Sequence, residues 1–307
     1  MKHIIEPVPK EDLEKELTED KFVRYTNYEK NEIYIITHHD SPNVMREIGR
    51  LRELSFRYAG GGTGKEVDID SFDTAEVPYS QLIVWEPKRK EILGGYRFIL
   101  FKNLSPDKNG NYNTATSQLF HFTDKFYKEY FSYTLELGRS FIQPNYQSSS
   151  PFRKGIFALD NLWDGLGSLV NNYPEVKYFF GKVTMYVDFN KRARDMILFF
   201  LEKYFKDVDK LVYAINPLVI STEELEKIFI GKDYLEDYKI LSRNVRALGE
   251  NIPPLMNSYM NLSPTMKTFG TSSNPHFGNV EETGILITID DIYETKKERH
   301  IKYIHTK

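Results

Sequence analysis

Carboxylates and guanidinium groups stand close together in several otherwise apolar segments of the chain. The segment 133–142 has the composition of a strand and carries Glu136 and Arg139, three residues apart. In a regular strand this spacing places the two side chains on opposite faces, unless a bulge, which Gly138 permits, intervenes. A carboxylate here can act as a general base and a guanidinium can hold a charge partner. An ordinary surface ion pair is an equally simple interpretation.

A second arginine, Arg97, lies inside the apolar strand expected at 92–100. An arginine in such a strand usually has a carboxylate partner, and the candidates are Glu136 and the aspartates of the segment 66–73. That segment has carboxylates at a spacing that suits calcium in part, but it lacks the glycine and distal glutamate of an EF-hand. We therefore expect no metal there, and we interpret it as a solvated loop or a loop that binds an acceptor substrate.

A polar loop and the start of an apolar helix follow the strand 133–142. The loop 145–154 holds three consecutive serines together with Arg153 and Lys154, and Gly155 opens the helix. The first turn of a helix has free N–H groups and the positive end of the helix dipole, which favour an anion. Serine hydroxyls and the two cations add donors. The pattern is that of a phosphate site, and a plain connection between strand and helix is the alternative.

The composition excludes several classes of chemistry. None of the 307 residues is cysteine, so disulfides, cysteine-ligated zinc, iron–sulfur clusters and a cysteine nucleophile are ruled out. The formal net charge of −3 gives no general argument for a nucleic-acid partner. The first twenty residues are charged, and the apolar runs are far shorter than the roughly 20 residues of a membrane helix. We expect a cytoplasmic protein that binds no nucleic acid.

Helices and strands alternate along the chain, which predicts one α/β domain. Around this domain we expect an N-terminal extension over 1–31, a helical insertion over about 216–252 and a charged tail over 290–307. The expected strands are 32–37, 80–85, 92–100, 133–142, 177–186, 211–215, 265–269 and 284–289, and the expected helices are 42–58, 155–169, 190–205 and 254–261.

The order of these motifs resembles two related families. Arg52 and Phe56 on a helix precede the runs DIDSFD, GGYRF and ELGRSFIQPNYQSS. This order is similar to that of the acyl-homoserine-lactone synthases and, more closely, of the bacterial ornithine/glycine N-acyltransferases often labelled hemolysin-like. The C-terminal run IPPLMNSYMNLSPTMKTFG resembles only the second family, and the resemblance covers roughly 33–289. It implies a GNAT-like α/β fold with a mixed central sheet flanked by helices.

The resemblance also implies roles for particular residues. A tryptophan of the synthase signature is missing between the first helix and the acidic loop, where Gly60–Gly64 stands, and this disfavours lactone formation. Glu136 is the expected base, with support of an arginine as its alternative role, and the amides of Phe141 and Ile142 are expected to stabilise the oxyanion. The implied sets are catalytic Glu136, Arg139 and Arg97, acceptor-binding Arg52, Phe56, Asp70 and Asp73, and donor-binding Phe141, Ile142, Gln147, Ser148, Ser149, Lys154, Gly155 and Ile156.

The function that the resemblance implies is transfer of a fatty, 3-hydroxy acyl group to the amine of glycine or ornithine, the first step of an amino-acid-containing membrane lipid. The expected partners are acyl carrier protein and a small amino acid, with contact to the inner face of the membrane through the product. No cofactor is expected to stay bound, because the acyl-phosphopantetheine thioester is a co-substrate, carried by the carrier protein in preference to coenzyme A. The alternatives are a signal synthase that uses S-adenosylmethionine and a non-catalytic hemolysin.

Overall fold

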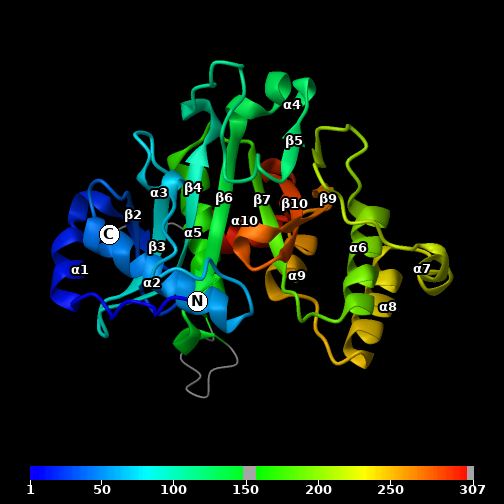
Figure 1. Ribbon diagram of the computed structural model, residues 1–307, viewed down its shortest axis with the longest axis horizontal. Coiled ribbons are helices and arrows are strands. Elements are labelled where there is room, and N and C mark those ends of the chain that lie inside the picture. The colour runs from blue at the N-terminus through cyan, green and yellow to red at the C-terminus, as the bar shows by residue number, and fades with distance from the viewer. Residues whose placement is uncertain (148–156, 303–307) are drawn as a thin grey trace. The chain divides into compact units, whose positions relative to one another are not determined.

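The computed structural model describes residues 1–147 and 157–302. Five of the residues predicted to bind the acyl donor therefore lie outside the described residues: Ser148, Ser149, Lys154, Gly155 and Ile156. The chain divides into two compact units. Figure 1 labels their helices and strands. Unit 1 consists of Met1–Ala115, Tyr133–Lys177 and Glu294–Lys307, and unit 2 of Thr116–Ser132 and Tyr178–Tyr293. The single domain expected from the sequence stays a prediction, and each unit is described by itself.

Unit 1 is built on antiparallel strands that follow one another in the order β1-β2-β3-β4-β6. The edge strand β1 comes from the segment expected to be an extension, so this segment takes part in the sheet. The strands are β1 (Phe22–Tyr25), β2 (Glu32–Ile36), β3 (Ser80–Glu86), β4 (Glu91–Leu100) and β6 (Thr134–Ile142). The helices are α1 (Lys10–Glu16), α2 (Pro42–Tyr58), α3 (Ser71–Thr74), α5 (Ala158–Asn172) and α10 (Glu294–His300).

Helices α2 and α5 cover opposite faces of this sheet, because successive residues of a strand point to opposite sides. On β3, Gln81 accepts a hydrogen bond from Arg52 of α2, whereas its neighbour Leu82 packs against Gly165 of α5. A Cβ at Gly165 would lie 2.5 Å from Leu82 Cδ2, so glycine lets α5 approach the strand closely. The face of β3 that carries Gln81 therefore faces α2, and the face that carries Leu82 faces α5.

The charged tail expected at 290–307 begins with α10, which packs against α5. Its last residue, His300, places Nδ1 at 2.8 Å from Oδ1 of Asp164, and both side chains are buried. The end of the described chain is thus part of unit 1.

Unit 2 contains two sets of antiparallel strands. One follows the order β7-β10-β9 with β7 (Tyr178–Met185), β10 (Val280–Thr288) and β9 (Lys267–Asn274), and the other pairs β5 (Phe120–Phe122) with β8 (Val212–Ala214). Its helices are α4 (Asp124–Glu129), α6 (Lys191–Phe205), α7 (Glu223–Ile228), α8 (Tyr234–Ala247) and α9 (Pro254–Met260).

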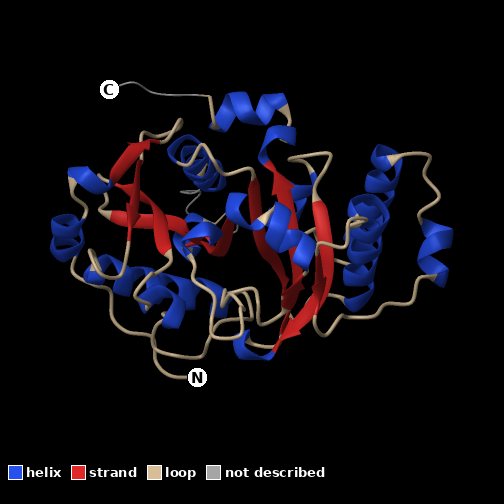
Figure 2. Ribbon diagram, turned by 90° about the horizontal axis from the view of Figure 1, so that it is seen from above, coloured by secondary structure: helices blue, strands red, loops and turns tan. Residues whose placement is uncertain are grey.

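Helices and strands are interspersed throughout (Figure 2), which confirms the predicted α/β class. Helices α7 and α8 lie where a helical insertion was expected. The last two strands are longer than expected, because the polar run that ends β9 is paired to β10 and carries no apolar pattern. Within residues 1–147 and 157–302, no helix is both long and apolar enough to cross a membrane.

Candidate active site

Strand β6 contains a bulge where the sequence permitted one, between its two charged residues and the end of the strand. Gly95 of β4 pairs with Phe141 and Arg97 pairs with Gly138, so two steps along β4 face three along β6. The extra residue allows Arg139 to turn, and its φ of 48° lies in the left-handed region. The bulge is thus confirmed, with the left-handed conformation at Arg139 instead of its neighbour Gly138.

This turn brings Arg139 to the same carboxylates as Arg97. Arg139 Nε lies 2.7 Å from Asp68 Oδ2, and its Nη2 lies 3.7 Å from Asp70 Oδ2. Arg97 Nη1 donates to both oxygens of Asp70 at 2.8 Å and to Asp73 Oδ2 at 3.3 Å. The two candidate partners of Arg97 are therefore resolved in favour of the aspartates. The interpretation of their segment as a solvated loop is wrong, because Asp68 and Asp73 are buried as ion-pair partners.

Arg52 completes this arrangement from the side of α2. Its Nη1 donates to Asp73 Oδ1 at 3.3 Å and its Nη2 donates to Gln81 Oε1. Gln81 in turn donates to Asp73 at 3.0 Å. Burial opposes the charge on Asp73, but Arg52 and Arg97 outweigh it and hold the pKa of that carboxyl well below its usual value. We refer to Arg52, Arg97, Arg139, Asp68, Asp70, Asp73 and Gln81 as the charge network.

The members of the charge network differ in what they offer a substrate. Arg52 and Asp73 have fully buried side chains, whereas 27% of the Asp70 side chain and 13% of the Arg139 side chain are exposed. Arg52 therefore holds Asp73 in place, and its predicted contact with an acceptor stays a prediction. Asp70 and Arg139 are the members that a substrate can reach.

Glu136 lies beside the charge network and is bonded to a residue that the sequence did not single out. The hydroxyl of Tyr79 donates to Glu136 Oε2 and accepts a hydrogen bond from the amide of Ala115 at 3.0 Å. Both Glu136 and Tyr79 are buried, and burial together with the carboxylate raises the pKa of the Tyr79 hydroxyl. The carbon of the Arg97 guanidinium lies 5.2 Å from the centre of the Tyr79 ring, a cation–π contact that fixes the ring.

Tyr79 also lines a cavity of about 440 Å³ in unit 1. Its wall combines the aromatic rings of Tyr79 and Phe72 with the polar side chains of Ser71, Thr74 and Asn113. Tyr79 therefore lines a cavity that is large enough for a small amino acid, and its hydroxyl is bonded to the buried carboxylate of Glu136. No spacing in the sequence indicates this role for Tyr79.

The two predicted oxyanion donors differ in orientation. Gln143 N donates to Leu93 O at 2.9 Å, and paired and unpaired amides alternate along an antiparallel ladder. The amide of Phe141 therefore points towards β4, and the amide of Ile142 points away from it. The carbonyl of Ile142 accepts a hydrogen bond from Gln147 Nε2 at 2.8 Å. Gln147, which is also predicted to bind the acyl donor, is thus attached to the end of β6.

The segment at Gly60–Gly64, where the synthase signature has a tryptophan, is held against α2. Glu53 accepts hydrogen bonds from the amide of Thr63 at 3.0 Å and from the amide of Gly64 at 2.7 Å. Gly61 N donates to the carbonyl of Phe56 at 2.8 Å, and the Phe56 side chain is buried. Phe56, which is predicted to bind the acceptor substrate, is thus packed near the end of α2.

Comparison with known proteins shows the family of the chain. Residues 51–154 match the model of the family described as "Acetyltransferase (GNAT) domain". A glycine N(alpha)-acyltransferase of Bacteroides thetaiotaomicron is 58% identical over 304 residues, which cover 98% of this chain and 90% of that protein. A second glycine N(alpha)-acyltransferase, of Phocaeicola vulgatus, is 57% identical and matches 98% of this chain and 93% of its own length.

Among solved structures, a CoA-dependent acyl-homoserine lactone synthase with SAM and isopentyl-CoA matches 54% of this chain and 72% of its own. Its TM-score of 0.32 and identity of 14% are too low to carry an argument. The two relatives, in contrast, match almost the whole chain at more than half of its positions. The chain therefore belongs to the same family as these two enzymes and is a GNAT-type N-acyltransferase.

Proposed function

We propose that the chain transfers a fatty 3-hydroxy acyl group from the phosphopantetheine thioester of acyl carrier protein to the amine of glycine. The observation that carries the choice of glycine over ornithine is the name shared by the two relatives, at 57% and 58% identity over 98% of the chain. The product would be an amphiphilic N-acylglycine, the first intermediate of an amino-acid-containing lipid. Its acyl chain would bring the enzyme into contact with the inner face of the membrane.

The acceptor would occupy the 440 Å³ cavity beside Tyr79. Its polar wall of Ser71, Thr74 and Asn113 offers hydrogen bonds to a small charged amino acid. Outside the residues that line the cavity, the partly exposed side chains of Asp70 and Arg139 would offer opposite charges to the ammonium and the carboxylate of the acceptor. These contacts favour a compact acceptor over one with a long side chain.

Glu136 would receive the proton of the attacking amine through Tyr79. The acceptor ammonium gives a proton to the Tyr79 oxygen while the Tyr79 hydroxyl proton passes to Glu136, across the hydrogen bond that joins them. The freed amine attacks the thioester carbonyl, and a C–N bond forms. The C–S bond then breaks, the departing thiolate takes up the proton held by Glu136 and leaves as the thiol, and the second proton of the attacking nitrogen passes through Tyr79 to the emptied carboxylate and from there to water. No protein nucleophile is needed, because the thioester is already activated.

The oxyanion formed in the attack would be stabilised by the amide of Ile142, which points away from β4. One such donor contributes about 3 kcal/mol to lowering the barrier. The bulge at Arg139 lies three residues before this amide and is held by Asp68 at 2.7 Å. The charge network would therefore fix the end of β6, and with it the position of the oxyanion donor.

The choice of carrier protein over coenzyme A rests on the sequence. The closely spaced glycines with which acetyl-CoA-dependent members of the wider fold bind pyrophosphate are not visible in 147–155. A phosphopantetheine arm has a single phosphate at this position, which the start of a helix can hold.

The test is a set of separate incubations analysed by mass spectrometry. The enzyme is given a 3-hydroxyacyl thioester on acyl carrier protein or on coenzyme A, with glycine, ornithine or S-adenosylmethionine as acceptor. We expect N-acylglycine, formed faster from the carrier protein. Acylation of ornithine without glycine would overturn the acceptor, faster transfer from coenzyme A would overturn the donor, and a lactone would overturn the reaction.

A further inference from the structure

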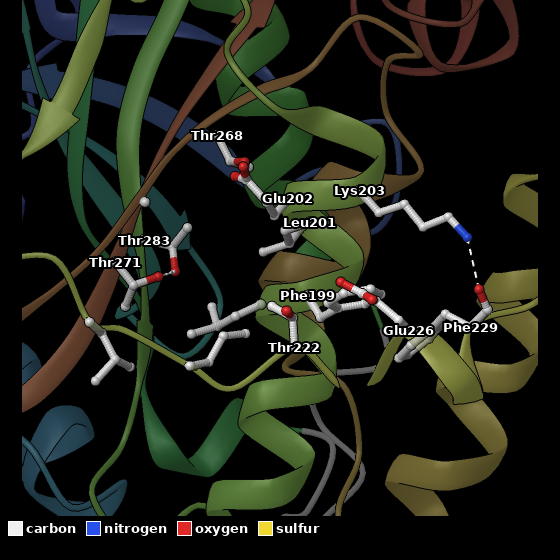
Figure 3. Close-up of a pocket in the computed structure, with 14 residues that line it drawn as sticks. Phe199, Leu201, Glu202, Lys203, Thr222, Glu226, Phe229, Thr268, Thr271 and Thr283 are labelled. Carbon is white, nitrogen blue, oxygen red and sulfur yellow. Dashed lines mark hydrogen bonds between the residues drawn. The ribbon is translucent and has the colours of Figure 1, made fainter. Parts of the chain in front are cut away.

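Unit 2 contains a cavity of about 600 Å³ that the proposed chemistry does not use. It lies between α6, the segment 218–222, α7 and the strands β9 and β10 (Figure 3). Its apolar wall is formed by Leu198, Phe199, Leu201, Leu218, Ile220 and Phe229. A volume of this size falls within the roughly 300–1,000 Å³ of small-molecule sites.

The buried hydroxyl groups on this wall are occupied by partners within the protein, whereas Thr222 is exposed. The side chains of Thr271 and Thr283 share a hydrogen bond of 2.7 Å across β9 and β10 (Figure 3). The hydroxyl of Thr268 donates to the carbonyl of Phe205 at 3.3 Å. These threonines therefore present methyl groups to the cavity, and their hydroxyls are bonded to other groups of the protein.

The one cation on the wall is also occupied. Lys203 Nζ donates to the carbonyl of Phe229 at 2.9 Å, as Figure 3 shows, and to Asp237 Oδ2 at 2.6 Å. Glu202 pairs with Lys206 at 2.5 Å. Glu226, the remaining charged residue of the lining, is exposed. The buried part of the wall thus offers a charged head group no counter-charge, so the charged end of a ligand must stay outside the cavity.

Aliphatic side chains continue from the wall onto the surface. Val219, between the lining residues Leu218 and Ile220, is 85% exposed, and Ile230, next to the lining residue Phe229, is 76% exposed. Large aliphatic groups gathered beside an apolar cavity mark a surface that meets apolar material. They extend the apolar wall to the solvent.

We propose that this cavity binds a single unbranched fatty acyl chain, which enters tail first and leaves its polar end at the surface. Apart from the exposed side chains of Thr222 and Glu226, the wall contributes apolar area and polar groups that are already paired, which is the chemistry of an alkyl chain and not of a nucleotide or a peptide. Each methylene that such a chain buries strengthens binding roughly fourfold. The chain belongs either to the acyl donor, in which case the inference rests on the proposed function, or to a separate lipid.

Binding is measured first, without any transfer reaction. The fluorescent C18 fatty acid cis-parinaric acid is titrated into the whole protein and displaced with saturated fatty acids of 8 to 16 carbons. Ile220→Trp fills the cavity from a half-buried segment, and Val219→Trp is its matched control, because the adjacent side chain is 85% exposed. Both variants are checked for an unchanged melting temperature.

We expect displacement to strengthen with each added methylene, binding to weaken at least tenfold in Ile220→Trp, and Val219→Trp to stay within twofold of the wild type. Equal binding by Ile220→Trp and the wild type, or no binding by the wild type, would overturn the proposal.

The source of the chain is then identified by transfer to glycine from thioesters of 8 and 16 carbons. If the cavity holds the donor chain, Ile220→Trp lowers kcat/KM for the long donor and leaves the short donor unchanged. Lost probe binding with unchanged selectivity supports the cavity and assigns it to a separate lipid. If the wild type acylates no glycine but the binding results hold, the proposed function fails and the cavity stands.

Discussion

The two units treat buried polar side chains in opposite ways. In unit 1, the charge network gathers three arginines and three aspartates from α2, the segment before β3, β4 and β6. In unit 2, the cavity wall pairs neutral hydroxyls, such as those of Thr271 and Thr283. Both arrangements pair buried polar side chains with one another, but only the first leaves a charge that a substrate can reach, at Asp70 and Arg139.

This difference separates two tasks. A group that moves a proton or orients a charged acceptor must itself be polar, and the surrounding charges must hold it against the cost of burial. A cavity for an alkyl chain needs walls whose polar atoms are already paired. The same difference predicts distinct responses when one partner is removed, because a stranded charge costs more than a stranded hydroxyl.

The largest effect on stability is expected from breaking the charge network at Arg52. Arg52→Ala leaves Asp73 buried without one of its guanidinium partners, and we expect a loss of about 3–5 kcal/mol in the free energy of unfolding. The control is Arg192→Ala, because Arg192 pairs with Glu224 at 3.1 Å on the surface and should contribute less than about 1 kcal/mol. Urea denaturation of both variants measures this. Equal losses would show that the charge network is no more than a set of surface pairs.

A smaller effect is expected from the hydroxyl pair of the cavity. Thr283→Val leaves the buried hydroxyl of Thr271 without its partner and should cost about 1–3 kcal/mol. The double variant Thr271→Val/Thr283→Val removes both hydroxyls and should be closer to the wild type than either single variant. A double-mutant cycle of unfolding free energies from urea denaturation measures the coupling of the two hydroxyls. Additive losses would contradict the view that they are hydrogen-bond partners of each other.

The smallest effect, counted per pH unit, is expected in the dependence of stability on acid pH. The pKa of Asp73 is lowered in the folded protein, so its contribution is present above its unfolded value, near pH 4, and is lost as the pH falls further. One proton changes stability by at most about 1.4 kcal/mol per pH unit. Asp73→Asn should therefore be less stable than the wild type at pH 7, and the difference should shrink below pH 4. The loss of stability in Thr283→Val should stay constant over the same pH range. If the losses in the two variants change with pH in the same way, Asp73 is not the charged partner of Arg52 and Arg97.

Some of the site could be predicted from the sequence because the relevant signals are local. The glycine between Glu136 and Arg139 permitted a bulge, and an arginine inside an apolar strand required a carboxylate partner. Both features are confirmed, since each follows from the two-residue repeat of a strand or from the cost of burying a charge. The alternation of helices and strands likewise indicated the α/β class.

Other features depend on contacts between distant segments. Tyr79 reaches Glu136 across 57 positions of sequence, and nothing near Tyr79 marks it as a partner of a carboxylate. The burial of Asp68 and Asp73 could not be predicted, because an acidic run is ordinarily solvated and only the converging arginines make its burial favourable. The cavity of unit 2 is formed by four separate segments that carry ordinary core residues.

The central claim is that Glu136 accepts the proton of the attacking amine, and the variant Glu136→Gln tests it most directly. Its rate of glycine acylation at saturating donor is measured against pH, together with its melting temperature. The amide keeps the shape of the side chain and an oxygen for the Tyr79 hydroxyl, so the protein should melt close to the wild type.

The account predicts a rate lowered by roughly 10²–10⁴-fold near pH 7 and partly restored at higher pH, where more of the acceptor amine is unprotonated. An unchanged rate would contradict the assignment of Glu136 as the base. A large loss of stability without recovery at high pH would contradict it as well and would make Glu136 a structural partner of its neighbours.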